Sequence, residues 1–152
     1  MKSESDDLLE AQKDRLKIRE NLLDNGIGEC QLRDPIVRQE VLKVVQTMPT
    51  KVWTLVIMPN HLHCLISLNE SRTLSSTLQT LKGISARRVN QKLKRSGSFW
   101  AKDYFDRIVR DRSHFFRCAR YIRRNPQKAA LGTTEFTLWE SGYVSKLLTG
   151  AR

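Results

Sequence analysis

Two histidines in one short segment are the residues of this chain whose type and spacing most directly suggest chemistry. His61 and His63 flank Leu62, and residues two positions apart on a β-strand point to the same side of the sheet. Two imidazole rings on one side can ligate a single divalent metal ion. Such a pair can also serve packing or lie at the surface, but the chain has only three histidines. We therefore treat the pair as a candidate metal site.

A second group of reactive side chains lies on a predicted helix near residue 120. Residues four apart share one face of a helix, so Arg117, Tyr121 and Asn125 should line up. The Tyr121 hydroxyl could act as a nucleophile, and the Asn125 amide oxygen could ligate a hard cation. In the alternative interpretation, Tyr121 is an aromatic residue at the rim of the core and Asn125 caps the helix before Pro126. The buried side of this helix should consist of Phe115, Ala119 and Ile122.

The positive charge of the chain is concentrated in one segment. The 152 residues include 27 Lys and Arg against 16 Asp and Glu, a net charge of +11. Residues 82–128 alone carry 15 basic and 3 acidic side chains, a net charge of +12. Aromatic rings are interleaved with these cations, a combination that suits the phosphates and bases of a nucleic acid. The alternative is a solvated basic face that serves only solubility.

Individual residues of the basic segment are candidates for DNA contacts. Most of the basic side chains would act on the phosphate backbone through their charge alone. Trp100, Tyr104 and Phe105 can be core residues or can stack on bases. The predicted DNA-contacting residues are Lys82, Arg87, Arg88, Lys92, Trp100, Arg107, Arg110, Arg117, Arg120 and Arg124.

The rest of the composition excludes several classes of protein. Three widely spaced cysteines without a Cys-x-x-Cys pair indicate neither a disulfide framework nor a cysteine zinc site. No apolar run approaches the roughly 20 residues of a membrane span, and residues 1–14 are polar and acidic, unlike a secretion signal. We expect a cytoplasmic protein without a membrane partner, whose length fits one domain.

The elements that must position these side chains can be predicted from apolar spacing and from capping residues. Strands are predicted over residues 52–58, 62–68 and 104–109, the first two forming an antiparallel hairpin around Pro59-Asn60. Helices are predicted over residues 6–24, 35–46, 74–94 and 113–124, with Asp34, Thr73 and Ser113 as caps of the last three. This order predicts an α+β fold, in which helices flank an antiparallel sheet.

Four blocks of the sequence occur in an order and spacing that resemble a known family. They are Met58 to His63 (MPNHLH), Leu81 to Asn90 (LKGISARRVN), Gly97 to Asp106 (GSFWAKDYFD) and Tyr121 to Pro126 (YIRRNP). Each block alone is a weak signal, but the ordered set closely resembles the REP-associated tyrosine transposases. These are HUH (His, hydrophobic, His) single-strand endonucleases, related to single-tyrosine insertion-sequence transposases. The resemblance spans about residues 26–141 and implies a single HUH-type, ferredoxin-like domain.

The resemblance also implies a reaction and a set of site residues. His61, His63 and Asn125 match the positions that bind Mg²⁺ or Mn²⁺ in that family, and Tyr121 matches the catalytic tyrosine. The implied activity is that of a transposase that nicks and rejoins single-stranded hairpin DNA, such as a repetitive extragenic palindrome. The nick would leave a 5′-phosphotyrosine and a free 3′-hydroxyl. A monomer or homodimer in the cytoplasm, associated with the nucleoid when bound to DNA, would fit this activity.

The N-terminal region departs from the family pattern. Members usually begin with a strand of the central sheet, whereas the sequence before Pro35 offers a charged helical segment, residues 1–25, ahead of a transposase-like domain, residues 26–152. The sheet could thus lack its first strand, use residues 27–32 instead, or pair with a second copy. The alternative functions are a noncatalytic basic nucleic-acid-binding protein derived from a truncated transposase, and a structural module whose histidines bind metal.

Overall fold

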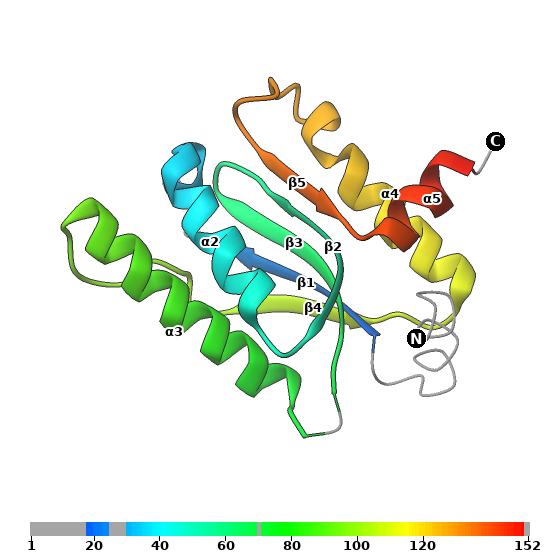
Figure 1. Ribbon diagram of the computed structural model, residues 1–152, viewed down its shortest axis with the longest axis horizontal. Coiled ribbons are helices and arrows are strands. Elements are labelled where there is room, and N and C mark those ends of the chain that lie inside the picture. The colour runs from blue at the N-terminus through cyan, green and yellow to red at the C-terminus, as the bar shows by residue number, and fades with distance from the viewer. Residues whose placement is uncertain (1–17, 25–29, 70, 151–152) are drawn as a thin grey trace.

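A five-stranded antiparallel sheet forms the centre of the computed structural model, which describes residues 18–24, 30–69 and 71–150 (Figure 1). The strand order is β4-β1-β3-β2-β5. The strands are β1 (Ile18–Asp24), β2 (Lys51–Ile57), β3 (His61–Ser67), β4 (Tyr104–Ile108) and β5 (Thr137–Glu140). The helices are η1 (Gln31–Arg33, a 3-10 turn), α2 (Pro35–Thr47), α3 (Leu74–Leu93), α4 (Arg112–Lys128) and α5 (Gly142–Gly150). The predicted α+β class with an antiparallel sheet is confirmed.

Helices cover both faces of the sheet (Figure 1). On one face, α2 and α3 bury an apolar cluster that includes Leu62 and Cys64 of β3. On the other face, α4 and α5 pack over a second cluster, to which α4 contributes Phe115, Ala119 and Ile122. The strand alternation and the helix stripe were therefore predicted correctly. No helix in the described part of the chain is long and apolar enough to cross a membrane.

The predicted hairpin and two of the predicted helix starts are confirmed. Strands β2 and β3 pair antiparallel, with Val56 opposite His63. The Asp34 carboxylate accepts a hydrogen bond from the Ile36 amide at 2.8 Å, which caps α2. Thr73 caps α3 in a reciprocal pair of hydrogen bonds with Ser76. These features depend on local sequence, which explains why they were predictable.

Strand β1 corrects the prediction for the N-terminal region. Residues 18–24 form a strand, not the end of a helix, and this strand lies between β3 and β4 in the sheet. The expectation that the sheet could lack its first strand is therefore wrong. The polar residues that suggested a helix are paired with β4: Arg19 with Asp106 at 3.0 Å, and Glu20 with Arg107 at 2.6 Å. The rest of the helix predicted over residues 6–24, residues 6–17, lies outside the described residues.

Helix α4 is longer at both ends than predicted. Its N-cap is Asp111 instead of Ser113, because the Asp111 carboxylate accepts a hydrogen bond from the His114 amide at 2.7 Å. The helix continues through Asn125 and Pro126. Pro126 lacks an amide hydrogen, but the Ala129 amide still donates to the Asn125 carbonyl at 3.1 Å. Asn125 is thus inside the helix, and its alternative interpretation as a helix cap is wrong.

The segment after residue 129 contributes two elements that were not predicted. Strand β5 pairs with β2 at the edge of the sheet. Helix α5 follows and packs Tyr143 against the rings of Trp53 and Phe115, at centroid distances of 5.6 and 6.1 Å. These elements are only four and nine residues long, so tertiary contacts contribute much to their stability.

Candidate active site

The two histidines lie side by side on the sheet face that α4 covers. Both belong to β3, and their ring centroids are 5.0 Å apart. Because Leu62 points to the opposite face, into the cluster under α2 and α3, His61 and His63 share the other. The tight connection before them is closed by the Met58 amide, which donates to the His61 carbonyl at 2.8 Å. The predicted common orientation of the pair is confirmed.

The two histidines differ in their surroundings, and those of His63 favour the neutral imidazole. The Nδ1 atom of His61 lies 2.7 Å from Oδ1 of Asn60, and donation to that oxygen would leave the ring's lone pair on Nε2. His63 is 6% exposed, and burial lowers its pKa to about 4; the charges of His61 and Arg107 also lower it, while that of Glu20 raises it. The Nδ1 atom of His63 is buried without a hydrogen-bond partner. A neutral imidazole binds metal without first losing a proton.

Tyr121 reaches the histidines from α4. Its ring centroid lies 5.5 Å from that of His63, with the two rings perpendicular. The side chain is 40% exposed, and the Lys128 ammonium lies 5.1 Å from the ring centroid. The opposite stripe of α4 anchors the helix on the sheet through buried residues such as Ile122. The phenol is therefore held beside the histidine pair yet open to a large ligand.

Asn125 lies one helical turn after Tyr121 and is partly buried. Its side chain makes no hydrogen bond within the described residues. Across the described ranges, no group of three His, Cys, Asp or Glu side chains is arranged to hold a metal ion. The assignment of Asn125 as a third ligand therefore stays a prediction.

A buried carboxylate beside His63 was not predicted from the sequence. Glu20 of β1 is 6% exposed; it accepts a hydrogen bond from Arg107 Nε at 2.6 Å and one from the Cys118 thiol at 3.0 Å. Burial raises the pKa of Cys118 to about 12, and the hydrogen bond to Glu20 adds to this effect. No sequence signal marked Glu20, because its segment was interpreted as a charged helix.

These groups line a pocket of about 230 Å³. Its walls are formed by Glu20, Asn21, Leu22, His63, Phe105, Arg107 and Tyr121. A larger groove of about 620 Å³ runs between α3 and residues 98–104, and another of about 370 Å³ lies near β5. Neither of these grooves is lined by a histidine. The small pocket is the candidate active site because it alone of these three joins His63 to Tyr121.

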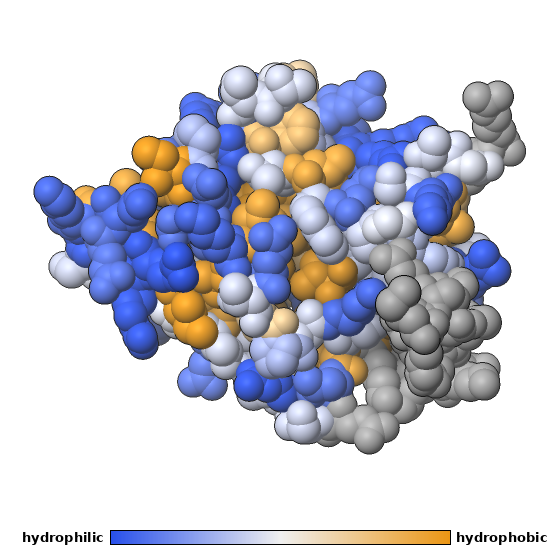
Figure 2. Space-filling model, in the orientation of Figure 1, coloured by the Kyte–Doolittle hydropathy of each residue, from blue (hydrophilic) through white to orange (hydrophobic). Residues whose placement is uncertain are grey.

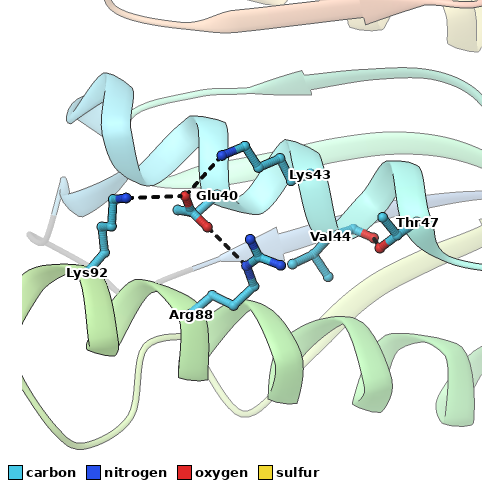
Figure 3. Close-up of polar contacts among 6 residues, drawn as sticks. All are labelled: Glu40, Lys43, Val44, Thr47, Arg88 and Lys92. Carbon is cyan, nitrogen blue, oxygen red and sulfur yellow. Dashed lines mark hydrogen bonds and ion pairs between the residues drawn. The ribbon is translucent and has the colours of Figure 1, made fainter.

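Several of the predicted DNA-contacting cations are already held by protein groups. Figure 3 shows the Glu40 carboxylate of α2 bonded to three basic side chains. Arg88 Nε lies 3.0 Å from Glu40 Oε2, and Lys92 Nζ lies 4.0 Å from Oε1. The hydrogen bond from Arg88 is the main cause that lowers the pKa of Glu40. Lys82 donates to the carbonyls of Ala101 and Lys102 at 2.7 and 3.0 Å. These cations join α3 to its neighbours.

Other predicted contacts are exposed and available to a ligand. On α4 and the segment before it, the exposed arginines among the predicted contacts are Arg110, Arg117, Arg120 and Arg124. On α3, Arg87 is exposed, and Figure 2 shows hydrophilic residues over the end of the molecule where α3 terminates. Arg123 of α4 is instead paired with Glu140 through two hydrogen bonds of 2.7 Å. The exposed arginines remain the candidates for phosphate contacts.

The position of Trp100 corrects one predicted DNA contact. Its side chain is 6% exposed, and its Nε1 donates to Ser85 Oγ at 2.8 Å. The ring also packs against Phe99 at a centroid distance of 4.9 Å. A ring buried in this way offers no face to a base, so Trp100 belongs to the core. Phe105, by contrast, is 66% exposed.

Comparisons with other proteins agree with this architecture. The sequence profile of the family described as "Transposase IS200 like" matches residues 15–125. A solved REP-associated tyrosine transposase bound to a REP hairpin aligns with a TM-score of 0.61 and 19% identity, over 78% of this chain and 71% of that one. A transposase candidate of Deinococcus radiodurans R1 aligns with a TM-score of 0.52 and 17% identity, over 70% of this chain and 88% of that one. No protein of curated function shows comparable sequence similarity.

Proposed function

Because this chain belongs to the IS200-like transposase family, we propose that it nicks and rejoins single-stranded hairpin DNA through a 5′-phosphotyrosine on Tyr121. The observation that carries the proposal is the arrangement of three rings from two distant segments. His63 of β3 lies 5.0 Å from His61 and 5.5 Å from Tyr121 of α4, measured between centroids. A merely structural hairpin would not require a half-exposed tyrosine beside two adjacent histidines.

The proposed step is a transesterification at phosphorus. The Tyr121 phenol gives its proton to solvent, and its oxygen forms a bond to the phosphorus of the scissile phosphodiester. The bond between phosphorus and O3′ breaks, and O3′ leaves with the electron pair and takes up a proton. The phosphoester is conserved on the protein, so attack by a 3′-hydroxyl on the same phosphorus reverses the step without an external energy source. A free tyrosine ionises near pH 10, so the phenol needs assistance at neutral pH.

The residues fit a divalent cation in the manner that the family resemblance implies. His61, His63 and Asn125 would hold Mg²⁺ or Mn²⁺. Two observations support the fit: the imidazoles share one side of β3, and burial keeps His63 neutral, with its pKa at about 4. When bound, the ion would polarise the phosphoryl oxygens and offset their developing charge. The residues of the chain position the phenol and keep one side of the site dry.

The DNA partner is proposed from charge and from the solved relative. The exposed arginines of α4, among them Arg117, Arg120 and Arg124, border the helix face that carries Tyr121 and would bind phosphates. The relative with a TM-score of 0.61 is bound to a REP hairpin, which supports a single-stranded hairpin as the substrate here. We expect a monomer or homodimer that works in the cytoplasm and associates with the nucleoid through its DNA.

The proposal is tested with end-labelled hairpin DNA, Mg²⁺ or Mn²⁺ and a denaturing gel. The wild-type chain should give a nick and a covalent protein–DNA adduct, and Tyr121→Phe should give neither. Tyr143→Phe is the matched control, because Tyr143 packs between Trp53 and Phe115 and should retain the adduct. An adduct that persists in Tyr121→Phe would refute the assignment of the nucleophile.

The proposed metal-binding role of His61 is tested with one variant and one control. His61→Ala should abolish cleavage while leaving hairpin binding in a gel-shift assay intact. His114→Ala is the control, since His114 is the third histidine, lies on α4 and accepts a hydrogen bond from the Arg110 amide of the segment before that helix. Cleavage at the wild-type rate by His61→Ala would argue against a metal role.

The second candidate function is a noncatalytic nucleic-acid-binding protein. One observation favours it: the described residues contain no third His, Cys, Asp or Glu placed to complete a metal site, so catalysis would depend on the neutral Asn125. In that case the wild-type chain should shift hairpin DNA in a native gel and yield no adduct with any hairpin or either metal ion.

A further inference from the structure

An exposed aromatic ring stands at the wall of the candidate active site. Phe105 of β4 is 66% exposed and lines the same pocket as His63 and Tyr121. Strand β4 is at the edge of the sheet, and Phe105 lies opposite Leu22 of β1. A single exposed apolar residue is unremarkable on a protein surface. Phe105, however, lies beside the proposed nucleophile Tyr121, and the residues around it indicate what it could bind.

The first neighbour is Arg107, two residues further along the same strand. Alternation places both side chains on the active-site side of β4, roughly 7 Å apart along the chain. The guanidinium is about half exposed, and its Nε donates to the buried Glu20 carboxylate at 2.6 Å. Its Nη2 lies 3.9 Å from Sγ of Cys118, so within the described residues Nη1 is the nitrogen left to a ligand, and it is held in a set direction. Phe105 and Arg107 thus offer a flat apolar face and a fixed positive charge side by side.

The size of the pocket limits which part of a DNA strand can enter it. At about 230 Å³ it is smaller than the roughly 300–1,000 Å³ that drug-sized ligands occupy. A pocket of this size has room for a single nucleobase. An unpaired nucleotide combines a flat ring with an anionic phosphate, the two features that Phe105 and Arg107 complement.

We propose that Phe105 stacks on the unpaired base next to the phosphate that Tyr121 attacks, and that Arg107, positioned by Glu20, binds the phosphate of that nucleotide. This inference rests on the proposed function and names the part of the substrate that the site recognises. Stacking against one aromatic face tolerates any base. The contact therefore selects unpaired over paired DNA at this position and places the strand for in-line attack.

Two other aromatic residues of the same region cannot stack on a base in this pocket, because neither ring faces it. Trp100 is buried and hydrogen-bonded to Ser85. Tyr104 precedes Phe105 on β4 and so points to the other side of the strand, where the Lys82 ammonium lies 5.8 Å from its ring centroid. Tyr104 is consequently a matched control: it is an aromatic neighbour on the same strand that faces away from the pocket.

The test uses hairpin DNA in which 2-aminopurine replaces each unpaired base in turn, bound to the full chain in EDTA so that no cleavage is needed. Stacking quenches the fluorescence of this base. At one position, wild-type protein should quench it severalfold, Phe105→Ala should restore it, and Phe105→Trp should quench it again. Tyr104→Ala should behave as wild type. Wild-type quenching that is unchanged in Phe105→Ala, or absent at every position, would overturn the proposal.

A cleavage assay then links the base to the reaction. An abasic residue at the identified position should slow wild-type cleavage about tenfold at low DNA concentration, and Phe105→Ala should be slowed about as much. Combining both changes should cause little further loss, whereas multiplicative losses would show that Phe105 does not act on that base. Thermal unfolding of Phe105→Ala checks that the variant is folded. If quenching is found but no hairpin is ever cleaved, the stacking stands and the proposed function fails.

Discussion

The chemistry proposed for this protein depends on a histidine whose pKa is changed by burial and on a tyrosine that stays accessible. His63 is almost fully enclosed, and its pKa falls to about 4 because an imidazolium would lose its hydration there and would face His61 and Arg107. Tyr121, only 5.5 Å away between ring centroids, stays 40% exposed. One buried neutral base and one accessible hydroxyl at the same place are the ligand and the nucleophile that the proposed function requires. Two predictions follow from burial at single residues.

The first concerns the pH dependence of stability in metal-free protein. His63 has a pKa of about 4 in the folded chain and 6.5 as its ordinary value, so between these values the unfolded state binds a proton that the folded state does not. Lowering the pH from 6.5 to 4 should therefore reduce the free energy of unfolding, by on the order of 3 kcal/mol from this residue. Urea titrations in EDTA of wild type and His63→Gln measure it. An equally steep pH dependence in the variant would contradict the prediction.

The second concerns the three thiols. Burial raises the pKa of both Cys64 and Cys118 to about 12, whereas Cys30 is exposed. Because the thiolate is the reactive form, iodoacetamide at pH 8 should label Cys30 in the native protein and leave the other two unmodified for far longer. Peptide mass spectrometry identifies the labelled site, and denatured protein serves as the control in which all three react. Fast labelling of Cys118 in native protein would show that it is accessible.

At the scale of the element, three faces of helix α4 differ in what they contact. Its buried stripe packs on the sheet, its next face carries Tyr121, and its outer face carries exposed arginines such as Arg120. Not every arginine of this helix is available for DNA. Arg123 makes two hydrogen bonds of 2.7 Å to Glu140 of β5 and so connects α4 to the edge of the sheet.

Neighbouring arginines of α4 should therefore respond differently to the same substitution. Arg120→Gln should weaken hairpin binding several-fold and reduce the dependence of log K on log salt by about one unit, because about one phosphate contact is lost. Its effect on stability should be small. Arg123→Gln should lower the free energy of unfolding by on the order of 1 kcal/mol, since its partner Glu140 is mostly buried but the arginine is partly exposed.

Fluorescence anisotropy over a range of salt concentrations measures the hairpin affinity of both variants, and urea unfolding measures their stability. Arg87 of α3 is exposed as well but belongs to another helix, so Arg87→Gln shows whether the contact extends to α3. The assignment fails if Arg120→Gln leaves both the affinity and its salt dependence unchanged.

At the scale of the whole molecule, β1 connects the two halves of the candidate active site. It pairs with β3, which carries the histidines, and with β4, which carries Phe105 and Arg107. Because β1 lies between β3 and β4 and pairs with both, it joins β4 to the rest of the sheet. The strand is also buried on both faces, since Leu23 lies in the cluster under α2 and α3 while Ile18 lies in the one under α4.

Hydrogen exchange measured by NMR should reveal this central position. The amides of β1 and β3 should exchange most slowly, close to the limit set by global unfolding, because these strands are paired on both sides. Those of β5, a four-residue strand at the edge of the sheet, should exchange faster. Rapid exchange throughout residues 18–24 would contradict the assignment of this segment to the sheet centre.

The sequence by itself determined the features that depend on local chemistry. The caps at Asp34 and Thr73, the alternation that turns His61 and His63 to one side, and the stripe that buries Ile122 all follow from backbone geometry within a few residues. The family resemblance adds that these residues belong together. Because caps, strand alternation and helix stripes depend only on residues close in sequence, these features could be predicted. The order of the predicted helices and strands then gave the α+β class.

Only the tertiary structure decided which polar residues are buried and which aromatic residues are exposed. In the sequence, Glu20 has the pattern of a solvated residue of a charged helix. In the structure it is buried and hydrogen-bonded to Arg107 and Cys118. Trp100 and Phe105 belong to the same sequence block, yet one is buried and the other is 66% exposed. The physical reason is common to both cases: burial and pairing are set by strands and helices that meet from distant parts of the chain, and local periodicity carries no information about those partners.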